Sequence, residues 1–84
     1  MWELLSFMQG RMRRSVLEEL RKGPRTPSYI ARSIGEHLSH VSRALSELSG
    51  KGLIECMTPG EPKNRIYQIT ELGRQVLVEL RKLE

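Results

Sequence analysis

The stretch HLSHVSRALSELSGKGLIECMTPGEPKNRIYQIT, residues 37–70, changes its periodicity halfway along, and this change indicates the fold. Its first half predicts a helix that buries Val41, Leu45 and Leu48, which follow the i, i+4, i+7 spacing of one helical face. The segment SGKG, residues 49–52, predicts the end of this helix, because glycine readily adopts the left-handed conformation common at such ends.

The second half of this stretch has the composition of a β-hairpin. Residues 53–57 (LIECM) and 65–70 (RIYQIT) contain the β-branched and aromatic side chains that favour strands. Residues 58–65 (TPGEPKNR), which link them, are rich in Pro, Gly and Asn, as is typical of a long turn. We therefore expect an antiparallel hairpin over about 53–70.

Two helices are predicted upstream of the opening stretch. Residues 11–22 (RMRRSVLEELRK) place apolar side chains at helical spacing and stop at a Gly-Pro pair. Residues 27–34 (PSYIARSI) follow Thr26, and a threonine before a proline is a good start for a helix. The apolar residues of 2–8 either extend the first helix or are separated from it by Gly10.

A further helix is predicted over about 70–83, with Thr70 as its N-cap. Its apolar residues recur at helical spacing. They are Leu72, Val76, Leu77, Leu80 and Leu83. The predicted order is helix, helix, helix, strand, strand, helix, which makes a mainly α fold with a small antiparallel β-hairpin (α+β).

Length and composition narrow the class of protein. A chain of 84 residues predicts a single domain over 1–84. Its net charge of +4 suits a polyanionic partner, although small domains that bind nothing anionic are often basic too. One cysteine, Cys56, excludes an internal disulfide framework and a multi-cysteine zinc cluster. Since neither a secretory signal nor an 18-residue apolar run is recognisable, we expect a cytoplasmic protein without membrane association.

Several segments together resemble a known family of proteins. They are TPSYIARSIG (26–35), HLSHVSRALSELSGKGLIE (37–55), the strand containing Tyr67, and ITELG (69–73). In this order and spacing they resemble winged helix-turn-helix transcriptional regulators of the MarR/ArsR-like superfamily, especially the short archaeal type. The resemblance covers about residues 11–80.

The resemblance implies a helix-turn-helix over about 27–49 and a wing hairpin over about 53–70. In such a motif the second helix enters the major groove of DNA. The resemblance further implies a sequence-specific regulator of transcription that binds double-stranded DNA and is not an enzyme. Repression by blocking polymerase is the simplest mechanism for a chain of this size. No cofactor is expected, and no small-molecule effector can be assigned.

The helix that begins near Leu38 carries an unusual polar face. Its outer residues are Ser39, His40, Ser42, Arg43 and Ser46. A solvated helix favours long Glu and Lys side chains, whereas short hydroxyls let a helix approach base edges closely. Arg43 can grip a guanine or a phosphate, and alternatively it can pair with Glu47 at i, i+4. We expect this face to contact DNA.

Two further segments are candidate contacts with the DNA backbone. Lys63, Asn64 and Arg65 lie at the predicted wing tip, where they can reach a minor groove or flanking phosphates, or simply face solvent. Thr26 and Ser28 lie at the start of a predicted helix, where backbone N–H groups favour a phosphate.

The basic residues Arg11, Arg13 and Arg14 face either DNA or solvent, and a run of charge is most often a solvated face. His37 and His40 are close enough to share a metal, but a zinc site needs three or four ligands. No Ser-His-Asp set, paired carboxylates or phosphate-binding Gly loop is recognisable.

Surplus apolar residues mark both ends of the chain. They are Trp2, Phe7 and Met8 at one end and Val78 and Leu83 at the other. We expect the end helices, 1–22 and 70–83, to form a homodimer interface, although the same residues can fold onto the core of one subunit. The alternative function is a winged-helix module that binds protein and not DNA, and its working surface would be an exposed apolar patch.

Overall fold

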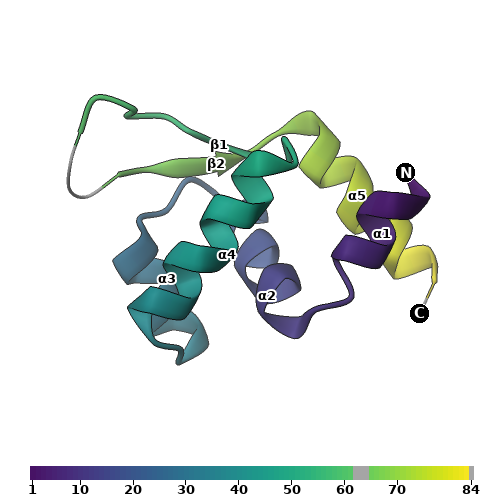
Figure 1. The fold of residues 1–84 in the computed structure, drawn as a ribbon, viewed down its shortest axis with the longest axis horizontal. Helices are drawn as coiled ribbons and strands as arrows, with labels where there is room; N and C mark the ends of the chain where they lie inside the picture. The colour runs from purple at the N-terminus through teal and green to yellow at the C-terminus, as the bar shows by residue number, and fades with distance from the viewer. Residues whose placement is uncertain (62–64, 84) are drawn as a thin grey trace.

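The computed structural model describes residues 1–61 and 65–83, which form five helices and two strands (Figure 1). In chain order these are α1 (Trp2–Phe7), α2 (Arg11–Arg21), α3 (Pro27–Ile34), α4 (Leu38–Gly50), β1 (Ile54–Cys56), β2 (Tyr67–Ile69) and α5 (Glu71–Lys82). The predicted mainly α fold with a wing hairpin is confirmed. The structure adds one short helix, α1, to the predicted order.

The predicted helix boundaries rest on local capping contacts. The Thr26 hydroxyl accepts the backbone N–H of Tyr29 at 3.2 Å and so caps α3. The Thr70 hydroxyl accepts the N–H of Gly73 at 3.1 Å and caps α5 in the same way. Gly35 ends α3 with a φ of 72°, a left-handed conformation that residues with a Cβ rarely adopt.

The N-terminal segment does not continue α2. The α1 helix ends at Phe7, and Gly10 adopts an extended conformation as the N-cap of α2, with φ −67° and ψ 129°. Leu5 and Met8 are buried, with Met8 only 1% exposed. Gly10 therefore separates two helices, and the turn between them folds α1 back beside α5 (Figure 1).

The hairpin is shorter than predicted. Its register pairs Ile54 with Ile69 and Cys56 with Tyr67, so the strands 54–56 and 67–69 replace the predicted 53–57 and 65–70. One more backbone bond, from Met57 N–H to Ile66 O at 2.7 Å, extends the pairing toward the wing tip. The regular ladder stops there because the Thr58 hydroxyl accepts the Ile66 N–H at 3.0 Å.

A third segment joins the hairpin, and the sequence did not predict it. Arg25 and Tyr67 exchange both backbone N–H···O bonds, at 3.1 and 3.0 Å, as an isolated antiparallel bridge. This bridge fixes the loop before α3 against β2. A single bridging residue has no periodicity, so no pattern along the chain could reveal it.

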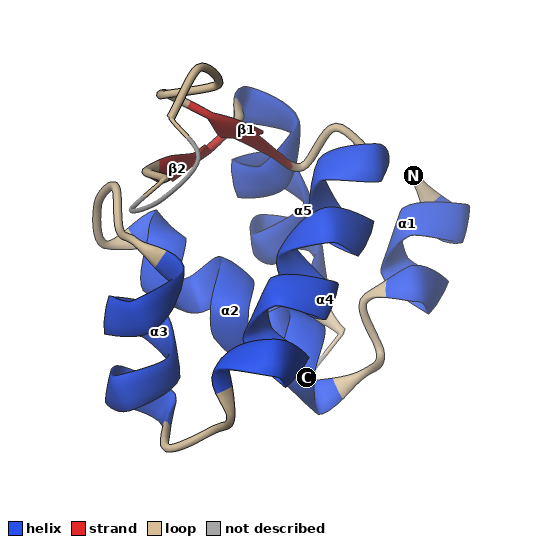
Figure 2. Cartoon of the chain, turned by 60° about the vertical axis from the view of Figure 1, so that its left-hand side comes forward, coloured by secondary structure: helices blue, strands red, loops and turns tan. Residues whose placement is uncertain are grey.

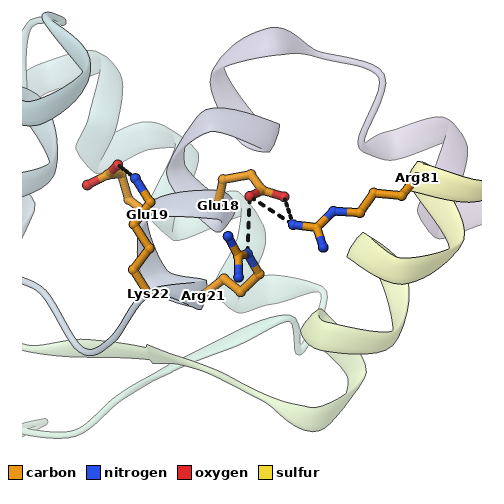
Figure 3. A network of polar contacts seen from close by, with 5 residues as sticks. All are labelled: Glu18, Glu19, Arg21, Lys22 and Arg81. Carbon is orange, nitrogen blue, oxygen red and sulfur yellow. Dashed lines mark hydrogen bonds and ion pairs between the residues drawn. The ribbon is translucent and has the colours of Figure 1, made fainter. Parts of the chain in front are cut away.

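One hydrophobic core holds the elements together, and α2 packs against α3, α4 and α5. The C-terminal half of α2 and the residue after it carry a network of polar contacts, one of which reaches α5 (Figure 3). Glu18 accepts hydrogen bonds from Arg21 Nε at 3.2 Å and from Arg81 Nη2 of α5 at 3.3 Å. Glu19 is buried and pairs with Lys22 at 3.1 Å. Burial opposes ionisation of Glu19, but hydrogen bonds from Ser33 and Lys22 outweigh it and lower its pKa.

The two ends of the molecule carry different features. Figures 1 and 2 place the hairpin at one end and α1 at the other, with α5 beside α1. The α3 helix lies on the same side of the molecule as the hairpin, and α4 stands between α3 and α1. This arrangement separates the helix-turn-helix and its wing from the apolar chain termini.

Candidate nucleic-acid interface

The α4 helix presents a buried face and an open face. Val41, Ala44, Leu45 and Leu48 are buried against the core. The side chains of the other face are exposed, and they include all five residues singled out from the sequence. These are Ser39, His40, Ser42, Arg43 and Ser46. Because α3 packs against α4 after a short turn, the pair has the geometry of a helix-turn-helix with α4 as its second helix.

Arg43 is available for a partner. Within residues 1–61 and 65–83 it has no hydrogen-bond or ion-pair partner. The alternative pairing with Glu47 is not the one adopted, because Glu47 binds Arg13 of α2 through both carboxylate oxygens. Arg13 Nε donates to Oε1 at 3.2 Å, and Nη2 donates to Oε2 at 3.1 Å.

Arg13 has a structural position that the sequence did not reveal. Besides Glu47 it binds the Phe7 carbonyl oxygen through Nη1 at 2.9 Å, and its guanidinium lies 4.1 Å from the centre of the Phe7 ring. Hydrogen bonds from Arg13 lower the pKa of the Glu47 carboxyl, burial opposes this effect, and the positive charges of Arg13 and Arg43 lower the pKa further. The sequence left open whether Arg11, Arg13 and Arg14 face DNA or solvent. In the structure Arg13 is internally paired, and Arg11 is exposed.

His40 lies at the border of the open face. Its Nδ1 is 3.7 Å from Glu36 Oε2, and its ring meets the His37 ring edge-on at a centroid distance of 5.5 Å. The described part of the chain contains no group of three or more His, Cys, Asp or Glu that could hold a metal ion.

The predicted backbone contacts have mixed positions. Ser28 is exposed at the start of α3, while Thr26 is half-buried with its hydroxyl oxygen engaged as the α3 cap. Arg65 is exposed, and its Nε donates to the Glu61 carbonyl oxygen at 2.9 Å. Lys63 and Asn64 lie outside the described residues.

Comparison with known proteins defines the fold type. The sequence matches no family model, and no curated protein is significantly similar to it. Among solved structures, the transcriptional regulator BldR from Sulfolobus solfataricus is 28% identical with a TM-score of 0.78, and the match covers 93% of this chain and 58% of BldR. A MarR family regulator from Neisseria meningitidis is 27% identical with a TM-score of 0.76, over 96% of this chain and 58% of that protein.

The chain has the winged helix-turn-helix fold of MarR- and ArsR-family transcription regulators. A third similar structure is a homodimeric winged helix-turn-helix DNA-binding domain from Mycobacterium bovis, described as a possible ArsR-family regulator. It is 26% identical with a TM-score of 0.71, over 90% of this chain and 68% of that domain. This winged-helix chain spans a little over half the length of BldR.

A groove separates α4 of the winged helix from the start of α2. It has a volume of about 390 Å³. Its lining residues are Gly10, Arg11, Met12, Arg13, His40, Arg43, Ala44 and Glu47. Arg11 lines this groove together with His40 and Arg43, so it lies at the edge of the open α4 face. Sequence reasoning could not place Arg11 there, because no periodic signal links residues so far apart in the chain.

The apolar surplus at the chain ends divides into two groups. Met8 belongs to the core of the single chain, and Phe7 is half-buried beneath Arg13, so neither is a free interface residue. Trp2, Val78 and Leu83 are exposed, by 74%, 49% and 63%. We refer to these three, with Met1, as the terminal apolar patch, because each lies on α1, on α5 or next to one of them, and Met1 and Val78 line one surface hollow. None of the described helices is both long enough and apolar enough to span a membrane.

Proposed function

We propose that this chain binds double-stranded DNA with sequence specificity and regulates transcription. The observation that carries the proposal is the open face of α4, where short hydroxyls surround an arginine that has no partner among the described residues. Similar winged-helix structures are named as transcriptional regulators or as a DNA-binding domain. The same names support a regulatory function over an enzymatic one.

The proposed contacts divide by depth in the major groove. The N-terminal residues of the second helix lie nearest the base edges, so Ser39, His40, Ser42 and Arg43 are the proposed readers. Ser46 lies farther along α4 and suits the backbone. We further propose backbone contacts for Thr26 and Ser28 at the start of α3, and for Lys63, Asn64 and Arg65 in the wing.

The proposed assembly is a homodimer that acts as a repressor. Both chain ends lie at the end of the molecule opposite the hairpin (Figure 1), so two subunits that join through the terminal apolar patch can leave both reading helices open. A two-fold dimer would present two α4 helices about 34 Å apart, one turn of DNA, to a pseudo-palindromic site. Binding there would exclude polymerase.

The exposed tryptophan also supports a second candidate function. A side chain as large as Trp2, 74% exposed, suits a surface that binds another protein. In that case the terminal apolar patch, and not α4, would be the working surface.

DNA binding is tested by fluorescence anisotropy of a labelled duplex at several salt concentrations. We expect binding that weakens steeply with salt, with a logarithmic slope of about −0.9 for each phosphate contacted. Duplexes enriched from a randomised pool should bind more tightly than their shuffled versions. Absence of binding at low salt would exclude the proposal and favour the protein-binding alternative.

Replacing Trp2→Glu should convert the dimer into a monomer. The substitution places a charge in the apolar interface, and it should leave folding intact because Trp2 packs little within its own chain. Sedimentation velocity measures the change in mass. Met57→Gln is the matched control, since Met57 is an exposed apolar residue (48%) next to the hairpin. An unchanged mass for Trp2→Glu would exclude the patch as the interface.

A further inference from the structure

The open face of α4 includes two adjacent stripes. Ser39, Ser42 and Ser46 recur at i, i+3, i+7 and form one stripe, whereas His40, Arg43 and Glu47 repeat the same spacing one residue later. The second stripe lines the groove shared with α2. The groove therefore runs along one flank of the face proposed to read bases.

A helix seated in the major groove has a phosphate backbone on each side of it, because the groove is only about 12 Å wide. The flank of α4 that faces α2 must then meet one of the two strands. Arg11 stands on the far wall of the groove, exposed and without a partner among the described residues. Its guanidinium suits a phosphodiester in charge and in hydrogen-bonding geometry.

One acid opposes this arrangement. Glu47 is the only carboxylate among the described residues that line the groove, and it lies four positions after Arg43. At this spacing in a helix an arginine and a glutamate normally attract each other. A free Glu47 would therefore repel phosphates and draw Arg43 away from the duplex.

Arg13 removes that obstacle. It occupies both oxygens of Glu47, at 3.2 and 3.1 Å, and is itself held by the Phe7 carbonyl and by stacking on the Phe7 ring. The anchor comes from α1 and α2, so it does not depend on α4. Glu47 is thereby neutralised at the groove edge, while Arg43 keeps its guanidinium for a partner.

Building on the proposed DNA binding, we infer that the groove between α2 and α4 receives the phosphate backbone of one DNA strand. Arg11 contacts this strand, and Arg13 is a positioning residue that keeps Arg43 free by holding Glu47.

The contact of Arg11 is tested by Arg11→Gln in the anisotropy titration. Loss of one phosphate contact should reduce the salt slope by about 0.9 and weaken binding about fivefold at 0.15 M salt. The loss should be alike for enriched and shuffled duplexes. Arg21→Gln is the matched control, because Arg21 is the last residue of α2 and Arg11 is the first. Its partner Glu18 keeps a second hydrogen bond, from Arg81, when Arg21 is replaced (Figure 3).

The role of Arg13 is tested by a double-mutant cycle with Glu47. Arg13→Gln should weaken binding by about fivefold or more, approaching the loss expected for a base-reading arginine. Adding Glu47→Gln should restore affinity to within about twofold of the wild type, because the competing charge is gone. Glu47→Gln alone should tighten binding by about twofold or more. Circular dichroism checks that each variant is folded.

The outcomes separate this inference from the proposed function. A wild type that does not bind DNA overturns both. A wild type that binds, with Arg11→Gln indistinguishable from Arg21→Gln, overturns the backbone contact alone. The positioning role is overturned if Glu47→Gln fails to rescue Arg13→Gln, since a purely structural loss would persist in the double variant. It is overturned as well if Glu47→Gln alone weakens binding.

Discussion

Replacing Arg43→Ala should weaken binding to an enriched duplex by about 1–3 kcal/mol, which is roughly 5- to 150-fold. The arginine stands on the open face of α4 within residues expected to lie at the base edges, and no described residue holds its guanidinium in a hydrogen bond or ion pair. Truncation therefore removes a potential bidentate contact to guanine without breaking an internal ion pair. Anisotropy on enriched and shuffled duplexes measures both the loss and its sequence dependence.

Two companion variants sharpen this prediction. Arg43→Lys keeps the charge but loses the planar fork, so base reading predicts a loss close to that of alanine and phosphate contact predicts a much smaller one. Ser49→Ala changes an exposed residue near the end of the same helix and should bind like the wild type. If Arg43→Ala folds normally and binds with unchanged affinity, Arg43 is not part of the site.

Replacing Gly73→Ala should lower the free energy of unfolding by about 3 kcal/mol or more. A Cβ at this position would overlap the Leu53 carbonyl oxygen and lie 2.7 Å from Ile69 Cγ1. The carbonyl belongs to the backbone and accepts the N–H of Thr70 at 3.0 Å, so it cannot simply move aside. Thermal unfolding should show a midpoint lower by roughly 12 to 24 °C for a domain of this size.

The matched control for this prediction is Gly50→Ala. Gly50 is the last residue of α4, and a Cβ there would meet no atom within 4 Å. Alanine is the better helix former, so this variant should be as stable as the wild type or gain up to about 1 kcal/mol. Equal stability losses in both variants would show that the α5–hairpin contact is looser than the structure indicates.

The α4 helix shows how far local patterns reach. Its length, its buried face and its five exposed polar residues follow from i, i+4, i+7 spacing and from the glycines that end it, all of which act within a few residues. The caps at Thr26 and Thr70 are equally local and were confirmed. The hairpin was predicted too, but its strands were placed one to two residues too long at either end.

The sequence by itself thus determined the order of the elements, their caps and the polar face of α4, because each depends on residues that are near neighbours in the chain. Only the tertiary structure decided that Arg13 pairs with Glu47, 34 residues away, and that Arg25 bridges Tyr67. It also decided that Met8 lies in the core while Trp2 remains exposed. Such contacts form between side chains that folding brings together, and they leave no periodic signal along the chain.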